Sequence, residues 1–412
     1  MISATQTQPQ PSRLNRAGAL LVVAMPLFAL INLIPFAHLG SLAIRPTDLL
    51  FVLAGLVLGL DMLFNLRAPK GVARYCCIIV FLLAVTALGD LAFPNSVDWP
   101  RYLRFIQTML WGALALAFIR EEKQLRRYGN MVLLCAVVVG GSSVYFFVTN
   151  PELQRIAGYM ALDPEVDGLL NEWGGFYVLA MAILLSRVYS GGWSLVRFAI
   201  LGLIGVGLLL LQSRSAFLAM GLIIFVFMVL WIRKIKRRES RWHSLVSVMC
   251  LLGLIAGIVL GSEMLPVNRI KESFNPKSFE AGSTQERYVG WRMSKELWGA
   301  SASRFLFGYG NKKFVGLLRG PTSESFYFDH GVGEGFINLM LIMTLLLTPA
   351  FKLRHEGIRS QRFILVMLIT LNALLVSVTG NVLVDPIFGG VTFGMLYGNL
   401  AVGGQSGPMQ SE

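Results

Sequence analysis

The chain has 412 residues, of which 55% are hydrophobic and only 14% are charged, and its mean hydropathy is +0.63. Soluble globular chains carry about 25% charged residues, so this composition excludes an ordinary soluble protein and indicates an integral membrane protein. The net charge of +13 does not indicate nucleic-acid binding, because the basic residues stand in short segments between apolar runs, where they set membrane topology.

Apolar runs of spanning length recur along the chain and predict an all-α polytopic membrane protein with about twelve transmembrane helices. A membrane β-barrel would instead show short alternating segments. In chain order the runs cover residues 18–38, 48–66, 74–93, 102–119, 129–149, 173–190, 194–212, 215–232, 244–262, 332–351, 362–380 and 386–404. We expect residues 1–412 to form a single integral membrane domain.

The distribution of Lys and Arg predicts the orientation of these helices. With the N-terminus in the cytoplasm, the inner segments hold 21 of the 36 basic residues and the short outer segments hold 5. Basic residues favour the cytoplasmic side, so both termini are expected there. The other basic residues lie in one long outer loop, about residues 262–331, between the ninth and tenth runs. Loops of this length in compact proteins are usually functional or disordered, and its mixed, non-acidic composition favours a functional loop.

An arginine flanked by small polar residues stands at the outer junction of two apolar runs, in the segment Gln212-Ser213-Arg214-Ser215. A guanidinium at this depth can face a phosphate while helix ends supply N–H donors. The alternative is an arginine that only ends a helix and snorkels toward water. The local sequence leaves both interpretations open.

The long outer loop combines basic and aromatic residues in two groups. Arg287 and Trp291 have the i, i+4 spacing that places them on one helix face, with Tyr288 and Arg292 beside them. The segment Gly308-Tyr309-Gly310 predicts a tight turn that brings backbone close to another group. A solvated basic loop with a hydrophobic anchor would carry the same residue types, and two glycines around one residue are weak evidence of a ligand.

Four ionisable residues stand within eleven positions at the entry to the tenth apolar run: Glu324, Asp329, His330 and Glu334. Ionisable groups at a membrane interface are candidates for function. The sequence carries no nucleotide-binding loop, no nucleophile elbow and no zinc-protease motif, and its four cysteines and four histidines form no metal-ligand spacing. No cofactor or metal is expected. Any reaction must therefore use a substrate that was activated elsewhere, and a lipid pyrophosphate is a natural leaving group for such a substrate.

Taken together, the segments "QSRSAFLAMGLIIF", "RYVGWRMSKELW" and "FLFGYGNKKF", followed by a short polar motif before another run, resemble the bacterial O-antigen ligase and Wzy-type O-antigen polymerase superfamily. The likeness covers about residues 208–347, a third of the chain. It implies a glycosyltransferase of the polytopic membrane type, GT-C-like and inverting. Such an enzyme works at the periplasmic face of the bacterial inner membrane and moves a glycan from undecaprenyl pyrophosphate without a nucleotide sugar.

The resemblance also suggests roles for individual residues. Arg214 and Arg287 are expected to clamp the pyrophosphate of the lipid-linked donor, with Arg292 assisting. Glu324, or failing that His330, is expected to take the proton of the acceptor hydroxyl. A further group is expected to offer stacking faces to sugar rings: Tyr288, Trp291 and Tyr309.

Three functions stay open at this stage. Ligases of the superfamily carry His-Asn shortly before the span that follows the long loop, and here no asparagine follows His330. This departure favours a polymerase of O-antigen or exopolysaccharide repeat units over a ligase that transfers glycan to lipid A-core. A transporter of lipid-linked oligosaccharide is the rival from another class, but its charged residues should line a path at mid-membrane. The expected partners are the lipid-linked glycan as donor and acceptor, the bilayer and a chain-length regulator protein.

Overall fold

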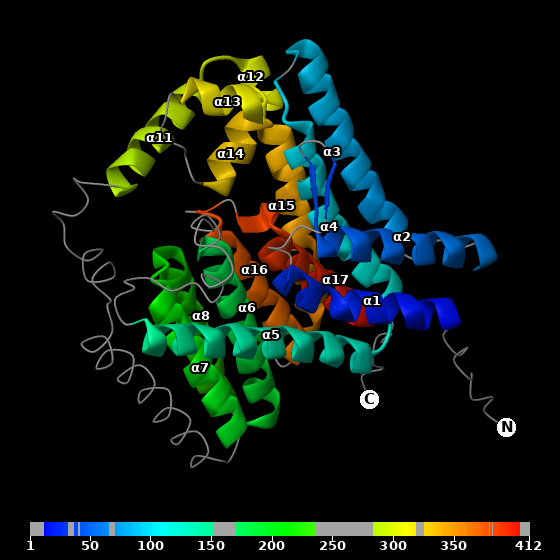
Figure 1. The fold of residues 1–412 in the computed structure, drawn as a ribbon, viewed down its shortest axis with the longest axis vertical. Helices are drawn as coiled ribbons and strands as arrows, with labels where there is room; N and C mark the ends of the chain where they lie inside the picture. Colours follow the sequence, from blue (N-terminus) through cyan, green and yellow to red (C-terminus); the bar gives the residue numbers. More distant parts are fainter. Residues whose placement is uncertain are drawn as a thin grey trace.

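The computed structural model describes residues 12–31, 37–39, 42–65, 71–94, 96–150, 170–235, 283–318, 325–358, 360–378, 380 and 382–403. Within these residues the fold is almost entirely helical (Figure 1). The first half contains α1 (Arg13–Leu30), α2 (Pro46–Asn65), α3 (Val72–Ala92), α4 (Trp99–Phe118), α5 (Glu122–Thr149), α6 (Leu170–Gly191), α7 (Leu195–Leu211) and α8 (Arg214–Ile235).

The second half begins with four helices that the sequence places in the long loop or at its end: α11 (Ser283–Trp298), α12 (Ala302–Phe307), α13 (Asn311–Leu317) and α14 (Phe326–Gly333). They are followed by α15 (Phe336–Leu353), η3 (Arg354–Glu356), α16 (Gln361–Val376), η4 (Val382–Val384), the π-helical turn η5 (Pro386–Gly390) and α17 (Val391–Gly403). Arg287 and Trp291, whose i, i+4 spacing predicts a helix, lie in α11, a helix of 16 residues.

The all-α prediction holds except for one small hairpin. Strands β1 (Ala37–Leu39) and β2 (Leu42–Ile44) pair antiparallel between α1 and α2, with Ala37 opposite Ile44. The hairpin occupies the expected outer connection between the first two spans. It adds no sheet to the bundle, because no other strand occurs among the described residues.

By length and composition, seven of the described helices can cross a membrane: α1, α2, α3, α5, α6, α8 and α15. The shorter apolar helices α7 and α16, with residues 387–403, lie at other predicted spans. Eleven of the twelve predicted runs coincide with helices, but the run at 244–262 lies outside the described residues. The chain is therefore an all-α membrane protein, and the number of twelve spans and the orientation stay predictions.

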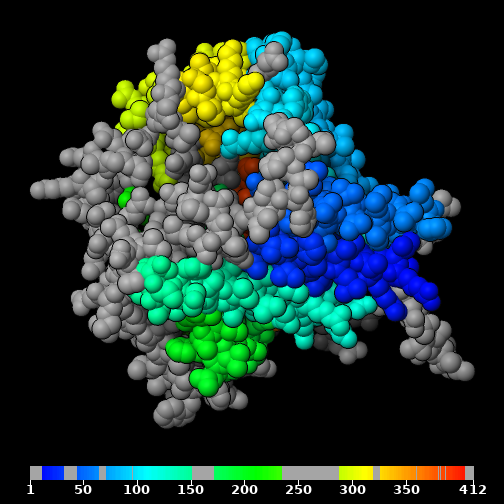
Figure 2. Space-filling view, in the orientation of Figure 1, coloured from blue at the N-terminus to red at the C-terminus, as the bar shows by residue number. Residues whose placement is uncertain are grey.

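The core lies between α4, α6, α16 and α17, because their side chains are buried on nearly all sides. α6 is an apolar helix with almost no exposed face, from Trp173 to Tyr189. α16 packs against α6 and α8, and α17 packs against α4. α1, α2 and α5 run side by side across the face seen in Figures 1 and 2 and expose apolar side chains, among them Leu53, Leu63 and Leu134. This exposure fits a surface solvated by lipid.

The loop helices cover one end of this bundle. α12 and α13, yellow in Figure 2, pack directly beside the end of α3. The amide of Lys312 donates to Ser96 O at 3.0 Å, and the amide of Gly310 donates to Gly333 O at 2.6 Å. Gly310 has a φ of +79°, and a Cβ there would lie 2.2 Å from Ser96 O, so only glycine fits this close approach. The predicted tight turn is confirmed, and it presses the loop against the start of α4.

The tenth predicted span begins later than the sequence indicates. Residues 326–333 form the separate helix α14, and α15 begins at Phe336. The break falls at Gly335, which has a φ of +91° and whose Cβ would lie 2.2 Å from Leu306 O. The backbone therefore turns where the hydropathy pattern continues, and His330 and Glu334 lie before the span.

Candidate functional site

Helix α14 is the centre of the candidate site, and its N-terminal end is fixed to the end of α16. The amide of Phe326 donates to Ser377 O at 3.0 Å, and the hydroxyl of Tyr327 donates to Leu374 O at 2.7 Å. Burial raises the pKa of Tyr327 to about 12, so its phenol stays a donor at neutral pH. The position of α14 is thereby tied to the helix bundle rather than to the loop alone.

A histidine and a glutamate on α14 form a buried pair. His330 Nδ1 lies 2.8 Å from Glu334 Oε2, and the two side chains are only 5% and 3% exposed. The imidazole lies against the ring of Phe105 at 4.6 Å and that of Phe326 at 4.3 Å between centroids. Among the described residues, its other nitrogen, Nε2, is buried without a hydrogen-bond partner.

This pairing favours one tautomer of a neutral His330. A carboxylate at Nδ1 holds the imidazole proton there, so the lone pair is left on Nε2. An imidazole oriented in this way is a general base for a hydroxyl that reaches Nε2. In other acyl-transfer sites a carboxylate likewise orients a histidine, although those proteins have unrelated folds.

The main chain around Glu334 is also held from both sides. Asn338 Nδ2 donates to Glu334 O at 3.1 Å and to Thr86 Oγ1 at 2.8 Å. The Glu334 amide donates to His330 O at 3.0 Å. These bonds hold the backbone from which the Glu334 side chain reaches His330.

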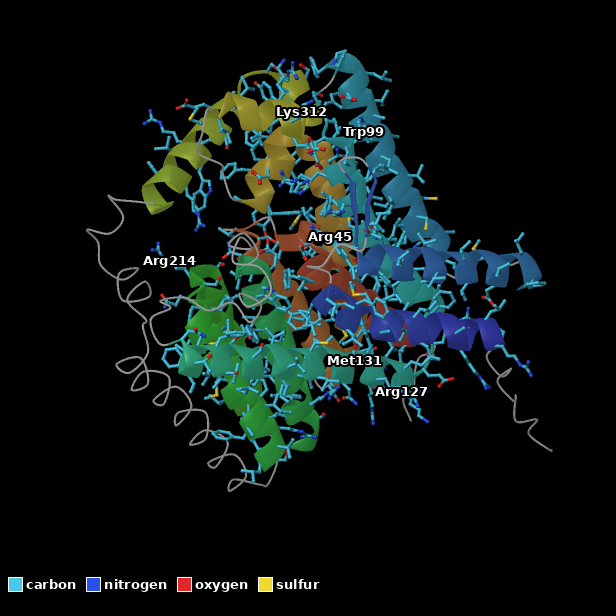
Figure 3. All side chains as sticks on the ribbon, viewed as in Figure 1. Arg45, Trp99, Arg127, Met131, Arg214 and Lys312 are labelled. Atoms are coloured by element: carbon cyan, nitrogen blue, oxygen red, sulfur yellow. The ribbon has the colours of Figure 1, made fainter. Side chains whose placement is uncertain are left out.

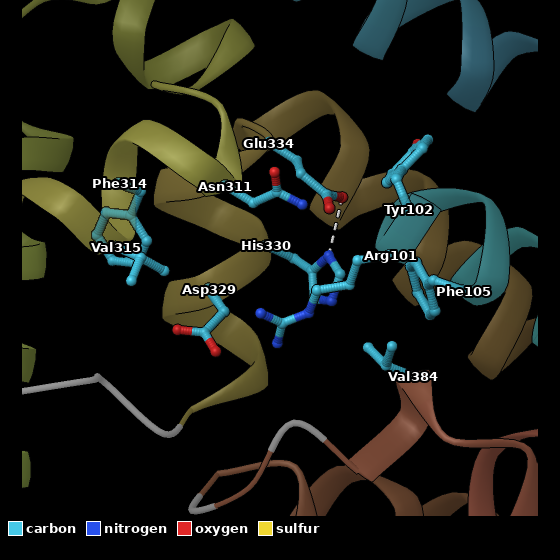
Figure 4. A pocket seen from close by; sticks show the side chains of 10 residues that line it. All are labelled: Arg101, Tyr102, Phe105, Asn311, Phe314, Val315, Asp329, His330, Glu334 and Val384. Atoms are coloured by element: carbon cyan, nitrogen blue, oxygen red, sulfur yellow. Dashed lines mark hydrogen bonds and ion pairs between the residues drawn. The ribbon is translucent and has the colours of Figure 1, made fainter. Parts of the chain in front are cut away.

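The pair borders a pocket that is partly open to solvent (Figure 4). Its wall is formed by α4, α13, α14 and η4: Arg101, Tyr102, Phe105, Asn311, Phe314, Val315, Asp329, His330, Glu334 and Val384. Figure 4 shows the Arg101 side chain extending past His330 on the side of Asp329. Asn311 Oδ1 accepts the amide of Asp98 at 2.7 Å and so joins the loop helices to α4. The pocket brings together the His330–Glu334 pair, an arginine and aromatic side chains.

The predicted binding residues of helix α11 lie on two different faces of the helix. The ring of Trp291 lies 6.1 Å from that of Phe328 on α14, and the half-buried Arg287, four residues earlier, shares that face. Tyr288 is 68% exposed, and Arg292 lies in an exposed ion pair with Glu296 at 3.2 Å. The structure thus brings Arg287 and Trp291 toward the α14 side and leaves Tyr288 and Arg292 on the outer side.

Tyr309 is directed into the protein rather than toward solvent. Its hydroxyl donates to Leu297 O at 3.1 Å, and the Arg304 guanidinium lies 4.8 Å from its ring centroid. Arg304 also covers the ring of Phe93 at 3.1 Å. These contacts give Tyr309 a packing role, and its predicted role as a sugar-stacking face stays a prediction.

Arg214 is the first residue of α8, and its surroundings are polar. Gln212 before it adopts a left-handed conformation with a φ of 51° and ends α7. Ser213 Oγ donates to Asn171 Oδ1 at 3.0 Å and lies 3.3 Å from Ser215 Oγ. Figure 3 places Arg214 at the end of α8 that faces the loop helices. The half-buried guanidinium therefore stands at the same end of the bundle as α14.

A charged cluster lies beside this end of the bundle and includes Arg45, Asp48 and Asp385. Asp48 accepts the Arg45 amide at 2.8 Å and Gln107 Nε2 at 2.9 Å. Asp385 accepts the Ile387 amide at 2.7 Å and so caps the start of η5. Burial raises the pKa of Asp385, and the guanidinium groups of Arg45 and Arg104 act against this rise.

Some of the site follows from sequence and some does not. His330 and Glu334 were both candidates, and their i, i+4 spacing is the signal that predicts their pairing. The contributions of Phe105 and Asn311 come from distant segments and carry no sequence signal. Glu324, the other candidate base, lies outside the described residues. Among the residues the structure describes, no group of three or more His, Cys, Asp or Glu side chains is placed to hold a metal ion.

Comparison with protein families gives a match that begins in α7 and ends at Glu334. Residues 198–334 match the family model described as O-Antigen ligase. A third of the chain thus matches the O-antigen ligase family. The resemblance predicted from the sequence is thereby confirmed, and the matched segment contains all eight predicted site residues. A search of curated proteins gives no match.

Proposed function

We propose that this protein is a membrane glycosyltransferase that polymerises undecaprenyl-pyrophosphate-linked oligosaccharide repeat units at the periplasmic face of the inner membrane. The observation that carries the proposal is the O-antigen ligase family match over residues 198–334, which contain all eight predicted site residues and the His330–Glu334 pair. The bilayer and a chain-length regulator protein are proposed as its partners.

On the donor side, Arg214 and Arg287 bind the pyrophosphate, and Arg292 guides the lipid-linked glycan from the outer face of α11. The acceptor hydroxyl forms the new bond to the anomeric carbon, and the bond from that carbon to the pyrophosphate oxygen breaks. Undecaprenyl pyrophosphate leaves with the electron pair, and the guanidinium groups offset its growing negative charge. Attack from the opposite side inverts the anomeric centre.

On the acceptor side, a base removes the hydroxyl proton as the new bond forms. Two candidates remain: Glu324, which lies outside the described residues, and His330. The geometry supports His330, because Glu334 at 2.8 Å holds the Nδ1 proton and leaves Nε2 as acceptor. Trp291 is proposed to hold a sugar ring beside α14, with Tyr288 and Tyr309 as the further stacking candidates.

A ligase that transfers the glycan to lipid A-core is the second candidate function. The observation that favours it is the same buried His330, because ligases of the superfamily carry a histidine before the corresponding span. Both functions share the donor chemistry and differ only in the acceptor.

Radiolabelled lipid-linked repeat units in proteoliposomes test the proposal. We expect the purified protein to form longer glycans with no partner added, Arg214→Ala to abolish elongation, and Arg233→Ala to leave it unchanged. Arg233 is a matched control, because it is an exposed arginine at the opposite end of α8. Movement of the label across the bilayer without elongation would instead identify a transporter.

Deletion of the gene in its host distinguishes the polymerase from the ligase. Loss of long chains, with one repeat unit still attached to its anchor, is the result expected for a polymerase. Full-length chains that accumulate on their lipid carrier would identify a ligase. Gel separation of the surface polysaccharides measures both outcomes.

A further inference from the structure

A second pocket lies at the opposite end of the bundle from the His330 site. Helix α4 starts at the first pocket and ends at Phe118, and the second pocket begins at the start of α5, four residues later. The end of α6, the start of α16 and the end of α17 complete its wall. The 20 residues of α4 therefore separate the two pockets by about 30 Å, at about 1.5 Å per residue.

Three arginines line this second pocket, against one carboxylate. Arg126, Arg187 and Arg362 come from α5, α6 and α16, and Glu122 is the acidic group. Glu122 lies 3.5 Å from Arg126 in an exposed ion pair, and Arg362 pairs with Glu356 at 3.4 Å. The lining keeps an excess of positive charge, which suits an anion.

Arg187 is held across α5 by specific contacts. Its Nη1 donates to Asn130 Oδ1 at 2.6 Å, and its Nη2 donates to the Arg126 carbonyl at 3.3 Å. A Cβ at Gly129 would lie 2.9 Å from Arg187 Nη2, so the missing side chain makes room for the guanidinium. The cation is thus fixed at the pocket wall rather than free in solvent.

The pocket also contains a buried acceptor that has no donor. Asn399 is fully buried, and its Nδ2 donates to Met395 O at 2.8 Å. Among the described residues, Asn399 Oδ1 has no hydrogen-bond partner. A buried carbonyl oxygen without a donor is costly, so a ligand that fits here brings a hydroxyl or amine as well as an anion.

We propose that this pocket binds the headgroup of an anionic phospholipid that carries a hydroxyl, as in phosphatidylglycerol. The phosphate lies among the arginines, and a headgroup hydroxyl donates to Asn399 Oδ1. A soluble polyol phosphate has the same chemistry, but the exposed face of α5 favours a lipid. On that face Arg126 and Asn130 are followed, at steps of four residues, by Leu134 and Val138, which are 54% and 50% exposed. Acyl chains can lie along this apolar stripe.

Native mass spectrometry of the full chain in detergent tests the proposal. Phosphatidylglycerol, phosphatidylcholine, phosphatidic acid and glycerol 3-phosphate are added separately, and the bound fraction is measured. The informative pair is Arg126→Gln and Arg127→Gln, because both residues are exposed on the same turn of α5 and only Arg126 lines the pocket. Neither change touches the buried core, so both variants are expected to fold.

We expect retention of phosphatidylglycerol over phosphatidylcholine, about a tenfold loss of affinity in Arg126→Gln and no change in Arg127→Gln. Asn399→Leu should lose the preference for phosphatidylglycerol over phosphatidic acid, which lacks the hydroxyl. Equal binding of phosphatidylglycerol and phosphatidylcholine, or equal losses in the two arginine variants, would refute the site. Binding of glycerol 3-phosphate with no selective retention of lipid would refute the lipid assignment.

Discussion

The clearest test of the candidate site is the substitution Glu334→Gln. Glu334 and Gln have the same size, so the change leaves no cavity around the buried pair. It removes the negative charge that accepts the Nδ1 proton of His330 at 2.8 Å. The backbone bonds of residue 334 to His330 and Asn338 are unaffected, because they use main-chain atoms.

Two orientations of the new amide set the range of the effect. If its oxygen faces Nδ1, a charge-assisted bond of about 1.5–3 kcal/mol becomes a neutral one of about 0.5–1.5 kcal/mol. The midpoints of these ranges differ by about 1.25 kcal/mol, which corresponds to a loss in rate of about eight- to tenfold. If the amide nitrogen faces Nδ1, the imidazole proton moves to Nε2 and the base is lost, which costs about 10²–10⁴-fold.

We therefore expect kcat for glycan elongation in proteoliposomes to fall at least about tenfold in Glu334→Gln, with the thermal midpoint in detergent little changed. His330→Gln should lose at least as much, and the double variant should be no worse than His330→Gln, because the two residues act as one unit. His355→Gln is the matched control, since His355 is exposed at the other end of α15.

Two results would contradict this reasoning. Full activity in Glu334→Gln together with an inactive His330→Gln would show that the carboxylate does not orient the base. Full activity in both variants, with Glu324→Gln inactive, would assign the proton transfer to Glu324 and leave the His330–Glu334 pair a structural role.

Three further predictions concern the framework of the site. Asp90 accepts Trp99 Nε1 at 2.9 Å, and Asp90→Asn replaces this acceptor oxygen, so we expect a loss of about 1.5 kcal/mol in unfolding free energy; an unchanged thermal midpoint would contradict it. Gly335→Ala should prevent folding, since the φ of +91° at Gly335 and the 2.2 Å approach to Leu306 O admit no side chain. Gly55→Ala is the control and should be tolerated, because a Cβ at Gly55 meets no atom within 4 Å. The yield and monodispersity of the purified variants measure both outcomes. Burial raises the pKa of Asp385, so the folded state holds the carboxyl proton more tightly than the unfolded chain does. The stability contributed by Asp385 therefore falls as pH rises from the ordinary pKa of an aspartate through the raised one. Asp385→Asn should flatten this dependence of the melting temperature on pH, and an unaltered slope would refute the prediction.

The sequence by itself determined the class of the protein. Long apolar runs with few charges can be stable only in lipid, and in lipid a continuous apolar run satisfies its backbone polar groups as a helix. Helix positions follow from this local rule, so most predicted runs coincide with helices. The superfamily also follows from sequence, because its motifs around Arg214 and Arg287 are local in the chain.

The tertiary structure decided how the candidate residues meet. Hydropathy continues across Gly335, but a backbone conformation that excludes a side chain ends α14 there and keeps His330 and Glu334 outside the span. Phe105 reaches His330 across 225 positions of sequence, a contact that depends on the packing of α4 against α14 and not on any local pattern. The direction of the two faces of α11 also depends on tertiary packing. Only the contact between Trp291 and Phe328 shows which face points toward the site.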